Sequence, residues 1–301
     1  MLSIIICSRN KTLPSELTEN ISNTIGVDYE MIVIDNSENS YSIFSAYNTG
    51  FAKSKYPYIC FVHEDVHFHT QNWGERIIAH LQEPTTGILG LAGSDLVTRI
   101  PGSCSGKTSY INIIQSDRSG KKTSIKNFYP EDFSQSKHST ILLDGVLLCL
   151  RRDLMEKLKF DEKIGGFHGY DFDIALQSTI AGYKNYVIYD IELEHFSRGQ
   201  FDGEFIRSLI TVFKKWEKFL PLLEPGITDE RRSQINEIEE KRLLKLTKKL
   251  IKFGFSTKEI IEETTYYAAI IKSPKITQKL KTIRLQIFFK RLFSCPQYLL
   301  K

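Results

Sequence analysis

The chain has 301 residues, of which 41% are hydrophobic and 25% charged, and its formal net charge is +4. These values are typical of a soluble globular protein and leave room for one large domain, or for a domain with an appendage. The chain contains no run of 18 or more apolar residues, so we expect no transmembrane helix.

The five cysteines form no Cys-x-x-Cys pair, so the sequence indicates neither a disulfide framework nor a zinc cluster. Cys7, Cys60 and Cys149 lie in apolar runs, where we expect them to be small buried hydrophobic residues. A reducing, cytoplasmic location fits this pattern best.

The first part of the chain alternates predicted strands and helices. We expect strands over Leu2–Cys7, Tyr29–Ile34, Tyr58–Val62 and Ile88–Ala92. We expect helices over Glu16–Ile25, Ser42–Lys53 and Asn72–Gln82. This order predicts an α/β fold, in which a mostly parallel, doubly wound central sheet carries helices on both faces.

Residues 94–140 are rich in Gly, Ser, Lys and Thr, and we expect an irregular excursion there that contains a hairpin. The sheet should resume over Thr140–Leu150 and Tyr186–Ile191, with helices over Asp153–Leu158 and Asp173–Ala181. Helices follow over Phe205–Leu220, Asp229–Phe253, Thr257–Lys272 and Lys275–Phe293. Pro225 and Gly226 interrupt this helical pattern, so we predict a first domain over 1–225 and a helical C-terminal region over 226–301.

The C-terminal region is strongly basic. Residues 1–240 contain 25 Lys and Arg against 33 Asp and Glu, whereas residues 241–301 contain 15 against three. Two amphipathic helices, Lys241–Lys252 and Lys279–Phe293, carry much of this charge. Such helices can lie on anionic membranes, or they can pack against the body or a second subunit, and both alternatives remain open. Nucleic acid is disfavoured as a partner, because the body is acidic and no recognition motif is present.

Acidic and imidazole side chains follow several predicted strands. His63, Glu64 and Asp65 follow the apolar run Tyr58–Val62, and His195 follows a later strand. Because the carboxyl ends of parallel strands meet at one edge of a sheet, these loops can gather there. Oxygen and imidazole ligands suit a divalent metal that holds a phosphate, so the sequence favours a nucleotide-using enzyme.

In their order and spacing, these motifs resemble a known family. The segments SIIICSRN, MIVIDNS, YNTGFAKS and YICFVHEDV are similar to the nucleotide-sugar half of an inverting, family 2 type glycosyltransferase with the GT-A (Rossmann-like) fold. The later segments LDGVLLCLRR, FHGYDFDI and HFSRG are similar to its acceptor half and to the C-terminal part of β-1,4-galactosyltransferases. The resemblance covers about residues 1–200.

The resemblance implies a role for each matching position. Donor-binding positions are Ser8, Arg9, Asp35, Asn48, His63 and Glu64. Asp65, the last acid of the D-x-D motif, and His195 would bind Mn²⁺ or Mg²⁺. Asp171 would be the catalytic base. The resemblance further implies a nucleotide-sugar donor, UDP-linked by preference, a glycan or lipid-linked acceptor, and work in bacterial polysaccharide assembly at the cytoplasmic face of a membrane.

Two positions depart from the family pattern and leave alternatives open. His63 replaces the first acid of D-x-D, and Tyr170 replaces the acid that usually precedes the base. The base therefore rests on Asp171, with Asp173 as the rival. A protein that binds sugar without catalysis, or serves as a scaffold, is one alternative. A nucleotidyltransferase is another, although the loop after the first strand lacks the glycine that it needs.

Overall fold

The computed structural model describes residues 1–103, 109–116, 122–127, 136–197 and 201–293. The chain divides into two compact units. The first comprises Met1–Val97 and Ser103–Ile227, and the second comprises Thr98–Gly102 and Thr228–Lys301. The sequence placed a single boundary near residue 225, whereas this division also assigns the short segment Thr98–Gly102 to the helical unit.

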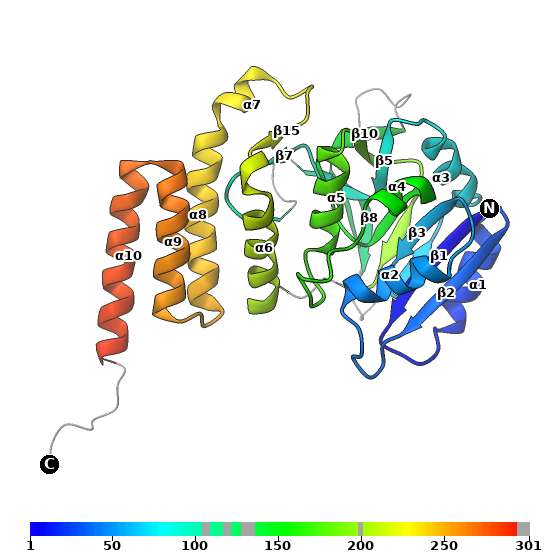
Figure 1. Cartoon of the computed structure of the whole chain (residues 1–301), viewed down its shortest axis with the longest axis horizontal. Helices are drawn as coiled ribbons and strands as arrows, with labels where there is room; N and C mark the ends of the chain where they lie inside the picture. The colour runs from blue at the N-terminus through cyan, green and yellow to red at the C-terminus, as the bar shows by residue number, and fades with distance from the viewer. Residues whose placement is uncertain (104–108, 117–121, 128–135, 198–200, 294–301) are drawn as a thin grey trace, which may run out of the picture. The chain divides into compact units, whose positions relative to one another are not determined.

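The first unit is built on a seven-stranded sheet (Figure 1) in the order β10-β13-β5-β12-β3-β1-β2. Its strands are β1 (Leu2–Ser8), β2 (Tyr29–Asp35), β3 (Tyr58–Val62), β5 (Thr86–Gly90), β10 (Lys137–Thr140), β12 (Leu147–Arg151) and β13 (Lys184–Ile188). Strand β1 runs parallel to β2 and β3, whereas β12 runs antiparallel to both β3 and β5. The predicted mostly parallel sheet is confirmed, with β12 inserted in the opposite direction beside β3 and with β10 antiparallel to β13 at one edge.

Helices cover both faces of this sheet. In β1, Leu2, Ile4 and Ile6 belong to one hydrophobic core and Ile5 to another, because successive side chains of a strand point to opposite faces. The first core contains residues of α1 (Ser15–Thr24) and α3 (Trp73–Leu81), and the second contains residues of α2 (Ile43–Lys53), α4 (Arg152–Lys157) and α5 (Tyr170–Ile180). The predicted arrangement of helices is confirmed.

A second sheet has the order β11-β6-β8-β14-β4, with β9 paired to β8. Its strands are β4 (Val66–Phe68), β6 (Ala92–Ser94), β8 (Ser109–Ser116), β9 (Lys122–Asn127), β11 (Leu142–Leu143) and β14 (Leu193–His195). The antiparallel pair of β8 and β9 confirms the predicted hairpin. A small third sheet pairs β7 (Leu96–Val97) with β15 (Leu222–Leu223).

Four predicted elements differ in the structure. The strand expected over Thr140–Leu150 is divided among β10, β11 and β12. The strand expected over Ile88–Ala92 is divided between β5 and β6, because the chain passes at Leu91 from the first sheet to the second. The helix expected over Asp173–Ala181 is α5, which begins earlier, at Tyr170, after Gly169 turns the chain with a φ of +82°. The helix expected over Asp229–Phe253 is divided into α7 (Asp229–Ser233) and α8 (Ile235–Lys252).

The cysteine prediction was wrong in part. A disulfide joins Cys60 of β3 to Cys149 of β12, which are opposite each other in the antiparallel register with Cα atoms 4.2 Å apart. Both residues are fully buried, as expected, but they are not free thiols. Because 89 residues separate them, their spacing carried no sign of the pairing.

The last helix of the first unit is α6 (Gly203–Trp216), followed by the short 3₁₀-helix Glu217–Phe219. The second unit contains α7, α8, α9 (Thr257–Ile271) and α10 (Pro274–Phe293). Buried apolar side chains from these helices form its interior: Leu243, Leu246, Leu250, Ile260, Tyr267, Ile276 and Leu280. Arg99 holds the segment Thr98–Gly102 to α8, since its guanidinium bonds the fully buried carboxylate of Glu239 at 2.6 and 3.0 Å.

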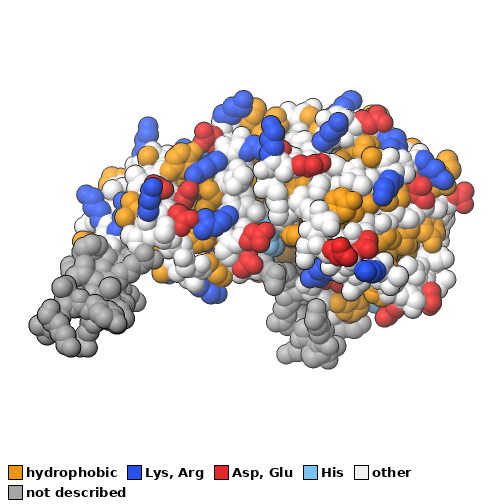
Figure 2. Space-filling view, turned by 60° about the horizontal axis from the view of Figure 1, so that its bottom comes forward, with side chains coloured by type: hydrophobic (Ala, Val, Ile, Leu, Met, Phe, Trp, Pro, Cys, Tyr) orange, Lys and Arg blue, Asp and Glu red, His pale blue; other side chains and the backbone are white. Residues whose placement is uncertain are grey.

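In Figure 2, Lys and Arg side chains are scattered over the visible face among acidic side chains and do not gather in one patch. Within the described ranges, which end at residue 293, no helix combines the length and the apolar character that crossing a bilayer requires.

Candidate functional site

The candidate site lies where β3 ends and β12 begins. The two strands are antiparallel, with Val62 opposite Leu147, so the loop after β3 lies beside the turn before β12. The backbone N–H of His63 donates to the carbonyl of Val146 at 3.2 Å. Strand β14 joins the same region, because the N–H of Phe196 donates to the carbonyl of Asp65 at 2.9 Å. The topology therefore gathers the predicted loops as expected for this edge of an α/β sheet.

His63, Asp65 and His195 form one cluster in which a ligand atom from each residue lies within 4.8 Å of the others. Oδ1 of Asp65 is 3.3 Å from Nε2 of His195 and 3.8 Å from Nδ1 of His63. The two imidazole nitrogens are 3.5 Å apart. In the part of the chain that the structure describes, this is the one group of three or more such residues placed to hold a metal ion.

The electrostatics of the cluster suit a cation. Burial and the neighbouring His195 lower the pKa of His63, which favours a neutral imidazole with a lone pair available. Burial acts to raise the pKa of Asp65, but the hydrogen bond and charge of His195 outweigh it and lower that pKa. One carboxylate with two imidazoles is a donor set that Mn²⁺ and similar divalent metals accept. The residues therefore fit the metal that the sequence implied.

Asp171 lies in the first turn of α5, where its side chain contacts the turn before β12 that borders this cluster. Its carboxylate accepts hydrogen bonds from the N–H groups of Gly145 at 3.0 Å and Phe172 at 2.9 Å. Burial and the nearby carboxylate of Asp144 raise the pKa of Asp171 to about 8. A carboxyl group tuned toward neutral pH is suited to take up a proton during a reaction.

Asp173, the rival candidate, has a different environment. Its side chain is fully buried, and Oδ1 is 2.7 Å from Nζ of Lys215 and accepts a 2.8 Å hydrogen bond from Nε1 of Trp216. Its other oxygen accepts from Nε2 of Gln177 at 2.8 Å. These contacts join α5 to α6 and satisfy the carboxylate inside the protein, so the geometry favours a structural role.

Sequence reasoning missed three residues that connect the metal cluster to Asp171. The hydroxyl of Tyr170 lies 2.8 Å from Nε2 of His63 and donates to the carbonyl of Gly145 at 3.1 Å. The N–H of the same residue, Gly145, donates to the carboxylate of Asp171. In the same turn, the carboxylate of Asp144 accepts a hydrogen bond from the N–H of Val146 at 3.3 Å. The sequence offered Tyr170 as a departure from the family pattern, and the segment Leu143-Asp-Gly-Val, but no partner for either.

Most predicted donor-binding residues meet at the ends of β1, β2 and β3. Glu64 accepts hydrogen bonds from Oγ of Ser8 at 2.6 Å and from Nε of Arg9 at 3.1 Å. Asp35 is opposite Ser8 in the parallel register and is exposed. The N–H of Ser37 donates to Oδ1 of Asp35 at 2.9 Å and lowers the pKa of Asp35, which keeps the carboxylate ionised.

Asn48 is the predicted residue that these contacts do not bring to the others. Its amide nitrogen donates to the carbonyl of Phe160 at 2.9 Å and to Oε1 of Glu162 at 2.8 Å. Its oxygen accepts from the N–H of Phe160 at 3.2 Å. The side chain therefore ties α2 to the loop after α4. This structural role explains the asparagine at this position without any contact to a nucleotide-sugar donor.

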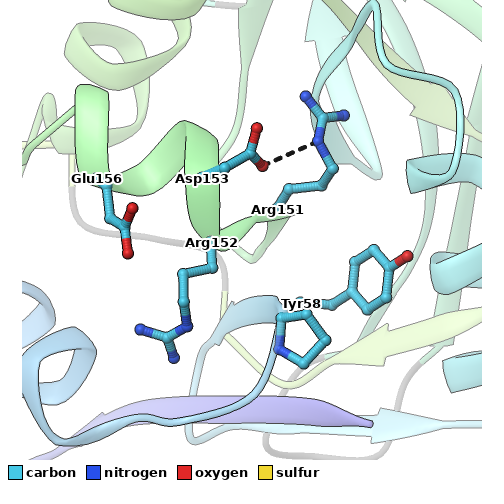
Figure 3. A pocket seen from close by; sticks show the side chains of 6 residues that line it. Tyr58, Arg151, Arg152, Asp153 and Glu156 are labelled. Atoms are coloured by element: carbon cyan, nitrogen blue, oxygen red, sulfur yellow. Dashed lines mark hydrogen bonds and ion pairs between the residues drawn. The ribbon is translucent and has the colours of Figure 1, made fainter.

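A cavity of about 300 Å³ lies at the other end of β3, lined by Pro57, Tyr58, Arg151, Arg152, Asp153 and Glu156. Figure 3 shows Arg151 and Arg152 pointing in opposite directions from this wall. Arg151 donates to the carbonyl of Thr86 at 2.9 Å and to carbonyls after α3. Arg152 donates to the carbonyl of Tyr56 at 2.8 Å and to Oγ of Ser54 at 2.7 Å. Both guanidinium groups therefore hydrogen-bond chain segments that follow a helix: Arg151 the segment after α3, and Arg152 the segment after α2.

Arg151→Lys should therefore lower the free energy of unfolding by about 1–3 kcal/mol, because an ammonium cannot reach the same set of carbonyls. Chemical denaturation measures the change. Glu156→Gln, a substitution in the same cavity wall, serves as the control and should leave stability unchanged. Both variants should bind nucleotide like the wild type, and weaker nucleotide binding by both would contradict the structural role.

Comparison with known proteins identifies the family. The model of a glycosyltransferase-like family matches residues 3–197, whereas no curated protein matches the chain. Among the solved structures that match the chain, two illustrate the shared fold. The crystal structure of GalNAc-T7 with UDP, GalNAc and Mn²⁺ has a TM-score of 0.51 at 14% identity and covers 88% of this chain. The mannosyltransferase PcManGT from Pyrobaculum calidifontis, in complex with GDP-Man and Mn²⁺, has a TM-score of 0.51 at 12% identity and covers 97%.

The matches cover 56% of the GalNAc-T7 chain and 86% of the PcManGT chain, so this chain spans little more than half the length of the first. At these identities the likeness shows the fold, which is GT-A. The family match extends over well more than half of the chain and includes β3, the turn before β12, α5 and β14. The chain belongs to the glycosyltransferase-like family.

Proposed function

We propose that the protein transfers a hexose from a nucleotide-linked donor to a hydroxyl of an acceptor, with inversion at the anomeric carbon and with help from a divalent metal. The observation that carries the proposal is the position of Asp171, a buried carboxyl with a raised pKa, linked through Gly145 and Tyr170 to the cluster of His63, Asp65 and His195.

Asp65 and His195, together with His63, would hold Mn²⁺ or Mg²⁺. When bound there, the metal would neutralise charge on the diphosphate of the donor. Ser8, Arg9, Asp35 and Glu64 lie at the adjacent strand ends and would contact the nucleoside. Two fold neighbours were solved with UDP or GDP-Man and Mn²⁺, which supports a nucleotide-sugar donor. We favour a UDP-linked sugar because of the sequence resemblance.

Asp171 would act as the general base. It accepts the proton of the acceptor hydroxyl while the hydroxyl oxygen forms a bond to the anomeric carbon, and the bond from that carbon to the diphosphate oxygen breaks. A positioned base of this kind contributes about 10²–10⁴-fold to the rate. The hydrogen bonds from Gly145 and Phe172 hold the carboxylate in place and stabilise its charged form before the reaction.

The acceptor would be a glycan or a lipid-linked glycan. Exposed aromatic side chains flank both parts of the site: Phe167 shortly before α5, and Phe196 after His195. Aromatic faces with few polar groups are typical of pockets that bind organic ligands. The likeness to β-1,4-galactosyltransferases supports an acceptor of this class. Work at the cytoplasmic face of a membrane, with the basic C-terminal helices as a peripheral contact or as a subunit interface, remains part of the proposal.

Proton NMR of donor turnover tests the function. The protein is incubated with an α-linked nucleotide sugar and Mn²⁺, with water or a glycan as acceptor, and the first product formed is observed. We expect a β-configured product. An α-configured product would contradict inversion. Donor that binds but never turns over, with any acceptor of a glycan panel, would favour a protein that binds sugar without catalysis.

The pH dependence of kcat/KM should report the ionisation of Asp171. A base must be deprotonated, so kcat/KM should rise with pH and level off above about 8, the raised pKa of Asp171. In Asp144→Asn one of the two causes of the raised pKa is removed, so the rise should occur at lower pH. A profile that is flat from pH 6 to 9, or identical in the two proteins, would contradict the assignment.

A further inference from the structure

The contact between Tyr170 and His63 gives His63 a defined orientation. The hydroxyl oxygen of Tyr170 lies 2.8 Å from Nε2 of His63, on the side of the imidazole ring opposite to Asp65 and His195. The other ring nitrogen, Nδ1, lies 3.5 Å from Nε2 of His195 and 3.8 Å from Oδ1 of Asp65. One nitrogen is therefore occupied by the protein, while the other faces the remaining members of the cluster.

The hydrogen-bond partners of Tyr170 determine which nitrogen of His63 carries the proton. A tyrosine hydroxyl has one proton to donate, and a backbone carbonyl can only accept. Tyr170 donates to the carbonyl of Gly145 at 3.1 Å. Its oxygen must then accept from Nε2–H of His63. Nδ1 of His63 is left without a proton.

Packing holds Tyr170 in the position that this arrangement needs. The side chain is 5% exposed. Its ring lies 5.5 Å from that of Tyr47 and 6.3 Å from that of Phe44, measured between centroids. A Cβ atom at Gly145 would overlap the Tyr170 hydroxyl, so the glycine is needed for the ring to approach this closely. Tyr170 therefore cannot turn away from His63 without repacking the core.

We propose that Tyr170 is a positioning residue that fixes His63 as the Nε2–H tautomer and directs its unprotonated Nδ1 toward Asp65 and His195, making His63 the third ligand of a divalent-cation site. This inference rests on the metal site of the proposed function. It adds that His63 binds the metal through Nδ1. It also adds that Tyr170, which is not itself a ligand, keeps the His63 imidazole in the orientation and tautomer that ligation needs. Hydrogen-bonded partners of ligating histidines serve this purpose widely in metalloproteins.

The set of one carboxylate and two imidazoles also predicts which metals bind. Imidazole favours transition metals, whereas Mg²⁺ and Ca²⁺ prefer oxygen ligands. We therefore expect the protein without donor to bind Mn²⁺ and Co²⁺ more tightly than Mg²⁺.

The first test is the tautomer of His63 in the metal-free protein. Nitrogen-15 NMR of histidine-labelled protein, with His63→Gln used to assign the signal, should show the Nε2–H form in the wild type. The Nδ1–H form would overturn the proposal without any need for a Tyr170 variant. Tyr170→Phe keeps the ring and removes the hydroxyl, and in it the His63 signal should shift toward a mixture of tautomers.

The second test is calorimetric titration with Mn²⁺ alone. Tyr170→Phe should weaken Mn²⁺ binding by about 10–100-fold, the range for loss of a partner of a metal ligand. Tyr183→Phe is the control, because it removes a hydroxyl just beyond the other end of α5 whose partner is Lys157. In a His63→Ala background Tyr170→Phe should have no further effect, since its action requires the imidazole.

Different failures can be told apart. Wild-type protein that does not bind Mn²⁺ would overturn the metal site of the proposed function, and with it the role of His63 as a ligand. Wild-type protein that binds Mn²⁺, with a Tyr170→Phe variant of equal affinity and unchanged His63 signal, would overturn the role of Tyr170 alone.

Discussion

Asp171→Asn should lower the rate of sugar transfer by about 10²–10⁴-fold, the usual contribution of a general base. The amide has almost the same shape, and it can still accept one of the two backbone hydrogen bonds that hold the carboxylate. Binding of donor and Mn²⁺ should therefore stay close to that of the wild type. Single-turnover kinetics at saturating donor measure the loss, and calorimetry measures the retained binding.

Asp173→Asn is the matched control for this variant, because it makes the same change two residues along the same helix. Its carboxylate is fully buried and pairs with Lys215, so the substitution should lower the free energy of unfolding by about 1.5–3 kcal/mol. Transfer by the folded protein should persist. If Asp173→Asn abolishes transfer while Asp171→Asn does not, the two roles are reversed and Asp173 is the base.

Asp65→Asn should weaken Mn²⁺ binding by more than about 100-fold, a larger loss than that expected for an outer partner of a ligand. Asp65 supplies the only carboxylate of the cluster, and its Oδ1 faces both imidazoles. Donor binding should lose its dependence on metal in the same variant. Calorimetry with Mn²⁺ alone, and then with donor in the presence and absence of Mn²⁺, measures both effects.

Glu64→Gln is the control for Asp65→Asn. Glu64 is the adjacent residue, but its oxygens face Ser8 and Arg9 at the end of β1. Its replacement should leave the affinity for Mn²⁺ alone unchanged. Equal loss of Mn²⁺ binding in both variants would show that the local charge, and not the geometry of the cluster, attracts the metal.

The sequence predicted the core of the first unit well because its strands are buried on both faces. Runs such as Leu2–Cys7 and Tyr58–Val62 are continuously apolar, which favours strands of a covered sheet. The direction of β12 could not be predicted in this way, because an apolar run looks the same in either orientation. That direction is nevertheless decisive for the site, since it brings Gly145 beside the end of β3.

The separate loops of the site could be predicted, but the contacts between them could not. His63 and Tyr170 were recognised as departures from the family pattern, each considered alone. The structure puts the two side chains in hydrogen-bond contact although 107 residues separate them. Similarly, nothing in the local sequence distinguished Asp171 from Asp173. Their different roles come from Lys215 and Trp216 of α6, which bond Asp173 and not Asp171 among the contacts described.

Asn48 and the cysteines show the same limit. Asn48 matched a donor-binding position, but the structure uses its amide to hold Phe160 and Glu162, which are distant in the sequence. Cys60 and Cys149 were expected to be separate buried residues, and they are joined because β12 runs beside β3. In each case the partner is distant in the sequence and is brought near by tertiary packing, which periodicity and spacing do not encode.

The most direct measurement is calorimetric titration of the purified protein with UDP and with a panel of UDP- and GDP-linked sugars, each in the presence and absence of Mn²⁺. The proposed function predicts that one nucleotide sugar binds, and that its binding requires Mn²⁺. Failure of the folded protein to bind any nucleotide or nucleotide sugar with Mn²⁺ present would contradict the assignment of His63, Asp65 and His195 as the metal site of a sugar transferase.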